Sequence, residues 1–446
     1  MAARPLPHRP APPDLLPQLR FLLRWLLLSA VVSGLAGTAS AGFLVALDWV
    51  THFRETHLSY WQLLVALPLG GLAVGLLYQY FGQRVVKGNN QLLEEIHHPR
   101  DVVPLRMAPL VLLGTLLTHL VGGSAGREGT AVQMGGALAD QLSRWRAAPA
   151  LRWLHLRPHD RRLLLVAGIS AGFASVFGTP LAGAVFGLEV LLIGRLRYEA
   201  LLPSVLAAFG ADWVTRAWGV GHTAYAIPVV PALSPTTVGI TLGCGVLFGL
   251  TARAFVAGTH GLAGWFQRRI AWPPLRPVVG GVALALLALA LQASLVPDVA
   301  RYLGLGVPTI VAAFAAPLPW YSFGLKMFFT SLTLGAGFKG GEVTPLFFVG
   351  AALGSALASV LPLPVALLAG MGFVAVFSGA ANTPLACTLM GLELFGTAGA
   401  AYLALACVVA YLFSGHRGIY GAQVVGTAKH PHLARDEGQP LGSLPR

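Results

Sequence analysis

The stretch Gly122–Gly136 reads G-G-S-A-G-R-E-G-T-A-V-Q-M-G-G and places Glu128 in a glycine-rich break between two apolar segments, 103–123 and 130–143. A carboxylate at membrane depth is costly unless it pairs, protonates or faces a water-filled path. The glycines allow the backbone to approach an ion closely, and Thr130 can cap a helix that begins there. The first amide groups of such a helix have no partner within it and suit an anion. The stretch therefore predicts proton-coupled anion transport.

The composition indicates a polytopic, all-α membrane protein. Of the 446 residues, 55% are hydrophobic and 11% are charged, and the mean hydropathy is +0.70. A soluble protein of this length could not keep so much apolar surface out of water. The formal net charge is +13, but the Lys and Arg residues are scattered between apolar spans, which argues against nucleic acid as a partner. We interpret this charge as a topology signal and as contact with anionic membrane lipid.

Basic residues also predict the orientation of the chain. Residues 1–20 are rich in Pro and Arg and are expected to form a cytoplasmic tail, because four arginines here and just beyond accompany a single acid, Asp14. These arginines are Arg4, Arg9, Arg20 and Arg24. The Arg-rich loop 144–162 is expected on the same side. The sequence therefore predicts a multi-pass protein of the cell membrane with its N-terminus in the cytoplasm.

Many of the apolar spans are short, interrupted by Gly or Pro, and closely spaced. The spans are predicted at 21–50, 61–81, 103–123, 130–143, 162–177, 179–194, 199–219, 236–264, 274–296, 321–335, 342–360, 362–378, 382–394 and 397–414. This pattern predicts broken helices that meet inside the bilayer around a protein-lined cavity. We divide the chain into a first half, 21–219, a second half, 220–425, and a short tail, 426–446, without regulatory domains.

The two predicted halves share an internal repeat. Gly126–Thr130 (G-R-E-G-T) recurs as Gly340–Thr344 (G-G-E-V-T) at an offset of 214 (340 − 126), and Thr179–Ala182 recurs as Thr383–Ala386 at an offset of 204 (383 − 179). Each half thus presents a glycine-led helix start that carries an acid. Transporters built from repeats place their site where such helices meet, so Glu342 is the expected counterpart of the first acid.

Three motifs in this order resemble the CLC chloride channel and transporter family: G-R-E-G-T at 126–130, G-E-V-T-P at 341–345 and R-G-I-Y at 417–420. The resemblance covers about residues 20–425. It implies two inverted repeats of tilted and broken helices, and a homodimer with a separate anion path in each subunit. It also implies that Glu128 is the gating glutamate and that Tyr420 lies beside the central anion. Neither a cofactor nor a metal ion is expected.

Departures from the common family pattern indicate which ion is carried. Asn89 replaces the serine that contacts chloride, Thr130 replaces a proline, and Val343 replaces a phenylalanine. Val190 stands where chloride/proton exchangers carry a second, inner glutamate. These substitutions are similar to those of the fluoride/proton antiporter branch. Fluoride is small and strongly hydrated, so its binding requires strong, close hydrogen-bond donors.

The candidate site residues fall into two groups. Glu128 and Glu342 are expected to gate the path and to carry protons, the latter replacing the missing inner glutamate. The expected anion ligands are Asn89, Asn90, Gly126, Arg127, Gly129, Thr130, Val343, Thr344 and Tyr420. Simpler interpretations stay open: the two asparagines as caps of a short helix, Glu342 as a helix-start charge, Thr344 as a helix cap, and Tyr420 as an interfacial aromatic.

Two other classes of function remain as alternatives. A CLC-type chloride/proton exchanger is disfavoured by Val190, and the retained Glu128 argues against an ungated chloride channel. An enzyme is not expected: Gly168–Gly172 fits G-x-S-x-G, but the nucleophile elbow needs a strand-turn-helix context, and this segment lies in an apolar helix. In the favoured mechanism, ionised Glu128 occupies the anion path, and protonated Glu128 leaves it to admit fluoride.

Overall fold

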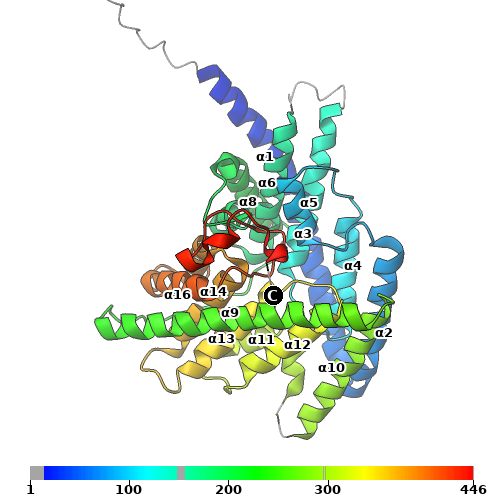
Figure 1. The fold of residues 1–446 in the computed structure, drawn as a ribbon, viewed down its shortest axis with the longest axis vertical. Coiled ribbons are helices and arrows are strands. Elements are labelled where there is room, and N and C mark those ends of the chain that lie inside the picture. The colour runs from blue at the N-terminus through cyan, green and yellow to red at the C-terminus, as the bar shows by residue number, and fades with distance from the viewer. Residues whose placement is uncertain (1–14, 148–155, 295, 297, 445–446) are drawn as a thin grey trace, which may run out of the picture.

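The computed structural model describes residues 15–147, 156–294, 296 and 298–444, and helices form most of it (Figure 1). The helices of the first half are α1 (Leu15–His57), α2 (Tyr60–Phe81), α3 (Asn89–His97), α4 (Met107–Leu120), α5 (Glu128–Gln141), α6 (Pro158–Phe177), α7 (Pro180–Glu189) and α8 (Leu201–Ala217). Those of the second half are α9 (Pro235–Arg269), α10 (Leu275–Ala293), α11 (Val307–Ala315), α12 (Ser322–Ala336), α13 (Val343–Leu357), α14 (Val365–Ala381), α15 (Pro384–Phe395) and α16 (Ala400–Phe413). Two short strands are β1 (Leu192–Ile193) and β2 (Val424–Val425).

The helices differ in whether they are long enough to cross a bilayer. Within the described residues, α1, α2, α9 and α10 are long and apolar enough to do so. By contrast α4, α7, α13, α14, α15 and α16 are apolar but have only 10–17 residues, fewer than the roughly 20 that a span requires. The chain therefore contains the short apolar helices that the Gly- and Pro-interrupted sequence predicts.

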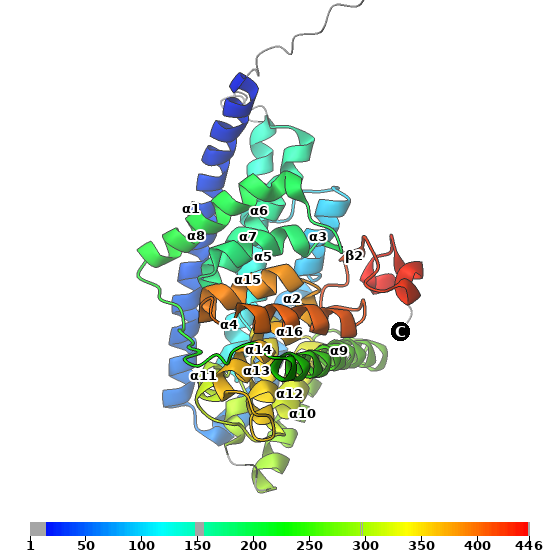
Figure 2. The same ribbon diagram turned by 90° about the vertical axis from the view of Figure 1, so that its left-hand side faces the viewer.

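Two predicted boundaries need correction. Residues 15–20, expected in the N-terminal tail, are the first turns of the 43-residue helix α1, which extends along one edge of the molecule (Figure 2). Pro17 does not prevent this, because proline is tolerated in the first turn of a helix. No span was predicted between 296 and 321, yet α11 lies there, beginning after Gly306 in a left-handed conformation. The first 14 residues of the predicted tail lie outside the described residues.

Small residues let the central helices pack closely in both halves. Helix α5 packs on α6 and α13 packs on α14. A Cβ atom added to Gly135 would lie 2.3 Å from the carbonyl oxygen of Gly168, and one added to Gly350 would lie 2.0 Å from that of Gly372. Because these distances are shorter than any van der Waals contact, only glycine fits. Ser170 of the G-x-S-x-G pattern lies buried inside α6, not at a strand-to-helix turn.

Two glutamates join the halves by reciprocal contacts. Glu189, at the end of α7, accepts hydrogen bonds from the backbone N–H groups of Leu385 and Ala386 at 3.0 and 2.8 Å. Glu393, near the end of α15, accepts them from Leu181 and Ala182 at 2.9 and 2.8 Å. Each carboxylate thus satisfies free amide groups at the start of the helix in the other half.

The C-terminal segment returns to the body of the protein. Strand β2 pairs in parallel with β1, with Leu192 opposite Val424 and Ile193 opposite Val425. Short 3-10 helices follow at Pro431–Asp436 and Leu441–Ser443. In Figure 2 this segment lies on the side of the molecule where α16 ends and α9 is seen end-on. The segment is therefore a packed element of the fold.

Candidate functional site

The two acid-bearing motifs meet at a backbone bridge between the halves. The N–H of Gly126 donates to the carbonyl of Gly341 at 2.6 Å, and the N–H of Gly341 donates to the carbonyl of Gly126 at 2.7 Å. Together they form an antiparallel bridge just before α5 and just before α13. A Cβ atom on Gly341 would lie 2.8 Å from the backbone nitrogen of Gly129. Glycine at these positions is required for so close an approach of two backbones.

The carboxylate of Glu128 binds at the start of the opposite helix, α13. The backbone N–H of Thr344 donates to Oε2 at 3.0 Å, and the Thr344 hydroxyl lies 2.6 Å from both carboxylate oxygens, so it donates its one proton to one of them. The backbone N–H of Arg127 also donates to Oε2, at 3.1 Å, and its Nε lies 3.6 Å from Oε1. Glu128 is 1% exposed. Its carboxylate oxygens therefore occupy a buried set of anion donors.

Thr344 is thus more than a capping residue of its own helix. The N-cap position of α13 is Glu342, and this cap makes no side-chain hydrogen bond. The acceptor at the helix start comes instead from Glu128, 216 residues away in sequence. Val343, which precedes Thr344 and is the first residue of α13, is also buried. The capping interpretation of Thr344 is therefore wrong, because its hydroxyl donates across the interface between the halves.

The asparagines do not cap α3 either. Gly88 occupies the N-cap position, without a side-chain hydrogen bond, and Asn89 and Asn90 are the first two residues of the helix. The Oδ1 atom of Asn90 accepts from the backbone N–H of Ala422 at 3.0 Å. The amide nitrogen of Asn89 faces Gly129, whose added Cβ atom would lie 3.2 Å from it, and its Oδ1 is buried without a partner in the described part of the chain. Asn89 therefore adds a donor next to the bridge.

Thr130 has a different role from the predicted one. Helix α5 begins at Glu128 after an N-cap at Arg127, so Thr130 lies inside the first turn and caps nothing. Its hydroxyl forms a hydrogen bond of 2.7 Å with that of Thr115 on α4. The cap prediction failed because the helix begins two residues earlier than expected. Thr130 therefore connects α5 to α4 and makes no hydrogen bond to the Glu128 carboxylate among those of the described residues.

Tyr420 is a buried residue of the site, not an interfacial aromatic. It is 4% exposed, and its ring lies edge-on to that of Phe186, with ring centres 6.4 Å apart. The loop that carries it is fixed because the N–H of Ile419 donates to the carbonyl of Ala380 at 2.9 Å. Two residues after Tyr420, the N–H of Ala422 donates to Asn90 of α3, whose neighbour Asn89 faces Gly129. The structure therefore brings the three motifs together.

Two cavities of very different size are lined by residues of this cluster. A narrow one of about 20 Å³ is lined by Arg127, Glu128, Thr344 and by aromatic rings that include the stacked pair Phe347 and Phe373. A wide one of about 730 Å³ is lined in part by Asn90, Gly421 and the ion pair of Lys87 with Glu94. Residues of the cluster therefore line both a very small cavity, at Glu128, and a large one, at Asn90.

Sequence reasoning missed residues that line these cavities. His222 and Tyr225 lie in the narrow cavity, and they come from the connection between α8 and α9, where no motif marks them. Lys87 and Glu94 flank the asparagines in sequence, and their charges in an apolar chain were the available signal. No group of His, Cys, Asp and Glu that could hold a metal ion occurs within the described residues.

Comparisons with known proteins agree with this geometry. Residues 69–415 match the family described as voltage gated chloride channel. A chloride/fluoride channel protein of Pseudomonas syringae pv. tomato is 54% identical over 424 residues, covering 95% of this chain and 90% of the relative. A putative chloride channel protein ClcB-like from Ralstonia nicotianae is 30% identical over 344 residues, covering 75% and 73%. The chain therefore belongs to the CLC family of chloride channels and transporters.

Solved structures show the same fold. A CLC-type fluoride/proton antiporter superposes with a TM-score of 0.82 at 36% identity, covering 90% of this chain and 98% of that one. A slow cyanobacterial Cl⁻/H⁺ antiporter superposes with a TM-score of 0.71 at 22% identity, covering 88% and 94%, and this likeness concerns the fold alone. The predicted all-α, CLC-type membrane fold and the family assignment are both confirmed. The family consists of ion channels and transporters, not of enzymes.

Proposed function

We propose that the protein exports fluoride in exchange for protons, with Glu128 as the gating and proton-carrying glutamate. The observation that carries the proposal is the position of its carboxylate on the N–H groups and the hydroxyl at the start of α13. A carboxylate and a small anion compete for the same donors. The likeness to a fluoride/proton antiporter at 36% identity, and to a relative named a chloride/fluoride channel protein at 54%, supports this choice of ion.

The donors suit fluoride because they are short, polar and closely placed. The Thr344 hydroxyl and the backbone N–H groups of Thr344 and Arg127 converge on one position, and the Asn89 amide lies nearby, beside Gly129. Charge-assisted hydrogen bonds of this kind are stronger than neutral ones, and a strongly hydrated ion needs them to replace its water.

The proposed cycle begins with ionised Glu128 on the donors, which excludes fluoride. Protonation removes the negative charge that holds the carboxylate there, so it rotates away and fluoride takes its place. Tyr420 and Glu342 lie next along the path, and Glu342 passes the proton on the inner side, where Val190 offers no acid. The exchange of a carboxylate for an anion at one position couples the two movements.

The orientation and assembly are part of the proposal. The wide cavity beside Asn90 opens to the cytoplasm, and the narrow one beside Glu128 opens to the outside. The excess of arginine near the N-terminus supports a cytoplasmic N-terminus in the cell membrane. Two copies form a homodimer embedded in lipid, and each copy carries its own path.

The experiment compares Glu128→Gln with wild type in liposomes. A fluoride gradient and then an equal chloride gradient are imposed, and proton uptake is recorded with a pH-sensitive dye. Wild type is expected to take up protons with fluoride and not with chloride, and Glu128→Gln is expected to lose proton uptake, because an amide cannot carry the proton. Glu199→Gln, at an exposed acid outside the site, is the matched control and keeps full coupling.

Other outcomes assign other functions. Equal proton uptake with chloride would make the protein a chloride/proton exchanger. Anion flux without proton movement in wild type would make it a channel, which the name of the relative from Pseudomonas syringae keeps as the second candidate. Continued proton pumping by Glu128→Gln would contradict the role of this glutamate.

A further inference from the structure

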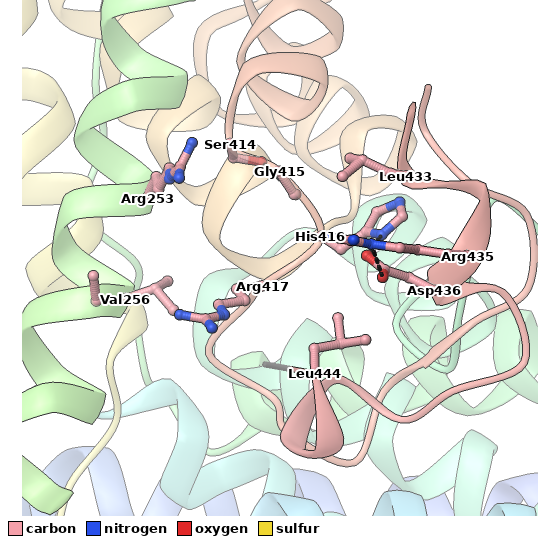
Figure 3. Close-up of a pocket in the computed structure, with 11 residues that line it drawn as sticks. Arg253, Val256, Ser414, Gly415, His416, Arg417, Leu433, Arg435, Asp436 and Leu444 are labelled. Atoms are coloured by element: carbon pink, nitrogen blue, oxygen red, sulfur yellow. Dashed lines mark hydrogen bonds and ion pairs between the residues drawn. The ribbon is translucent and has the colours of Figure 1, made fainter. Parts of the chain in front are cut away.

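A second basic cavity lies away from the anion path, where α9, the end of α16 and the C-terminal segment meet (Figure 3). It has a volume of about 310 Å³. Figure 3 shows Arg253 on α9 at one side, Arg435 on the 3-10 helix at the other, and Ser414–Arg417 between them. Three arginines from three elements of the chain therefore line one cavity: Arg253, Arg417 and Arg435.

The one acid that lines this cavity is already engaged. Asp436 accepts a hydrogen bond from Nδ1 of His416, the two atoms lying 2.8 Å apart, and its other oxygen lies 3.8 Å from Nε of Arg435. The side chain of His416 is 2% exposed. The carboxylate is therefore drawn to the buried imidazole, and the lining keeps an excess of positive charge.

Carbonyl oxygens at the end of α16 do not repel an anion here, because a buried lysine binds them. Nζ of Lys429 donates to the carbonyls of Tyr411 and Gly415 at 2.8 and 2.6 Å and to the hydroxyl of Ser414 at 3.0 Å. Ser414 and Gly415 form part of the cavity wall. The negative end of the helix dipole, which would disfavour an anion, is thus occupied by the lysine ammonium group.

The rest of the lining is apolar, formed by Val256 and Ala257 of α9 and by Leu433 and Leu444 of the C-terminal segment. A cavity lined by both arginines and apolar side chains suits a phosphate group attached to a carbon chain. Guanidinium groups bind phosphate oxygens with two parallel hydrogen bonds, whereas a fluoride ion offers no such pair of acceptors. The volume exceeds that of a single small anion.

We propose that this cavity binds a phosphate group, either in the headgroup of an anionic phospholipid or in a soluble phosphate ester. The site lies three residues from Tyr420 along the chain, because Arg417 begins the R-G-I-Y motif. Both sources share the same chemistry, two or three guanidinium groups around the phosphate oxygens. The proposal is independent of which anion the protein transports.

Binding is measured by isothermal titration calorimetry on the full-length protein in detergent, at constant ionic strength and without fluoride. The probes are inorganic phosphate, a short-chain phosphatidylglycerol and the matching phosphatidylcholine. The test variant is Arg253→Gln/Arg435→Gln, since both side chains are exposed and their loss leaves the core intact. The matched control is Arg268→Gln/Arg269→Gln, which removes two exposed arginines from the end of α9 outside the cavity.

Wild type and the control are expected to bind, and the test variant is expected to bind about tenfold more weakly or not at all. Binding of phosphatidylglycerol but not of inorganic phosphate assigns the site to a lipid headgroup. Binding of inorganic phosphate with no preference for the lipid assigns it to a soluble ester. The proposal is overturned if neither probe binds, or if the test variant binds as tightly as wild type while its unfolding temperature shows that it is folded.

Discussion

Thr344 supplies two donors to one position, its backbone N–H and its hydroxyl, and both contact Glu128. The hydroxyl can also accept, so it can face the carboxylate in either protonation state. No other described residue donates to this carboxylate from the second half of the chain through its side chain. Thr344 is therefore the single position at which the polarity of the site is most easily tested.

Thr344→Val keeps the shape of the side chain and removes the hydroxyl donor. We expect fluoride efflux from liposomes to fall about tenfold or more, because a hydrogen bond to a charged group contributes roughly 1.5–3 kcal/mol. Efflux is measured with a fluoride-selective electrode. Thr344→Ser retains the hydroxyl and is expected to remain close to wild type. Wild-type efflux by the valine variant would show that the hydroxyl only packs.

Among the elements, the bridge between Gly126 and Gly341 fixes the starts of α5 and α13 relative to each other. The reciprocal contacts of Glu189 and Glu393 do the same for the starts of α15 and α7. Three helix starts, those of α7, α13 and α15, are thus satisfied by a carboxylate from the opposite half. The site depends on this arrangement, since Glu128 and its donor Thr344 belong to different halves.

Gly341→Ala tests the bridge, because the added Cβ atom would lie 2.8 Å from the backbone nitrogen of Gly129 and neither backbone can yield easily. We expect a loss of about 1–3 kcal/mol in the free energy of unfolding, as for other overpacked positions, together with a loss of transport. Unfolding is followed by heating in detergent. Gly239→Ala on α9 is the control, since its Cβ would meet nothing within 4 Å. Equal unfolding temperatures for the two variants would contradict the prediction.

The sequence suggested which residues could form the site, but it did not predict which atoms contact one another. The repeat pointed to Glu342 and Thr344 as partners opposite Glu128, because glycine-rich motifs are local and easily compared. The structure places Thr344 in contact with Glu128, 216 positions away, whereas the role of Glu342 stays a prediction. The repeat could not show which atoms make the contact. For the same reason Thr130 was predicted to cap its own helix, although its partner Thr115 lies on another one.

Long apolar helices could be predicted from the sequence, whereas a short helix was missed. Helix α12 lies within one residue of the predicted span 321–335. Helix α11 was missed, because its nine residues are too few to register as a span. The division of the chain at residues 219 and 220 remains a prediction, and it falls in the connection between α8 and α9.

At the scale of the whole molecule, a series of hydrogen bonds connects the C-terminal segment to Asn90 at the candidate site. Lys429 contacts the Oδ1 atom of Asn382, whose amide donates to Gln423 at 2.9 Å. The neighbouring N–H of Ala422 donates to Asn90 in the wide cavity. Burial lowers the pKa of Lys429, while the oxygen acceptors around Nζ stabilise its ammonium form. The segment after Tyr420 therefore supports the candidate site next to Asn90.

Lys429→Met removes this connection and leaves buried oxygen acceptors without a donor. We expect the free energy of unfolding to fall by several kcal/mol, because unpaired buried polar groups are costly, and we expect a protease to release the C-terminal segment faster. Limited proteolysis followed by mass spectrometry measures the second effect. Arg269→Met, at an exposed position on α9, is expected to leave both unchanged. Cleavage at the wild-type rate would show that β2 alone holds the segment.

The bridge at Gly126 and Gly341 and the paired glutamate contacts limit how the protein can move. Many transporters built from repeats expose their site alternately to each side by rocking one half against the other. Here such a motion would break two backbone hydrogen bonds at the site and four more at the starts of α7 and α15. In the proposed cycle, access therefore alternates by rotation of side chains, above all Glu128, within a frame that stays fixed.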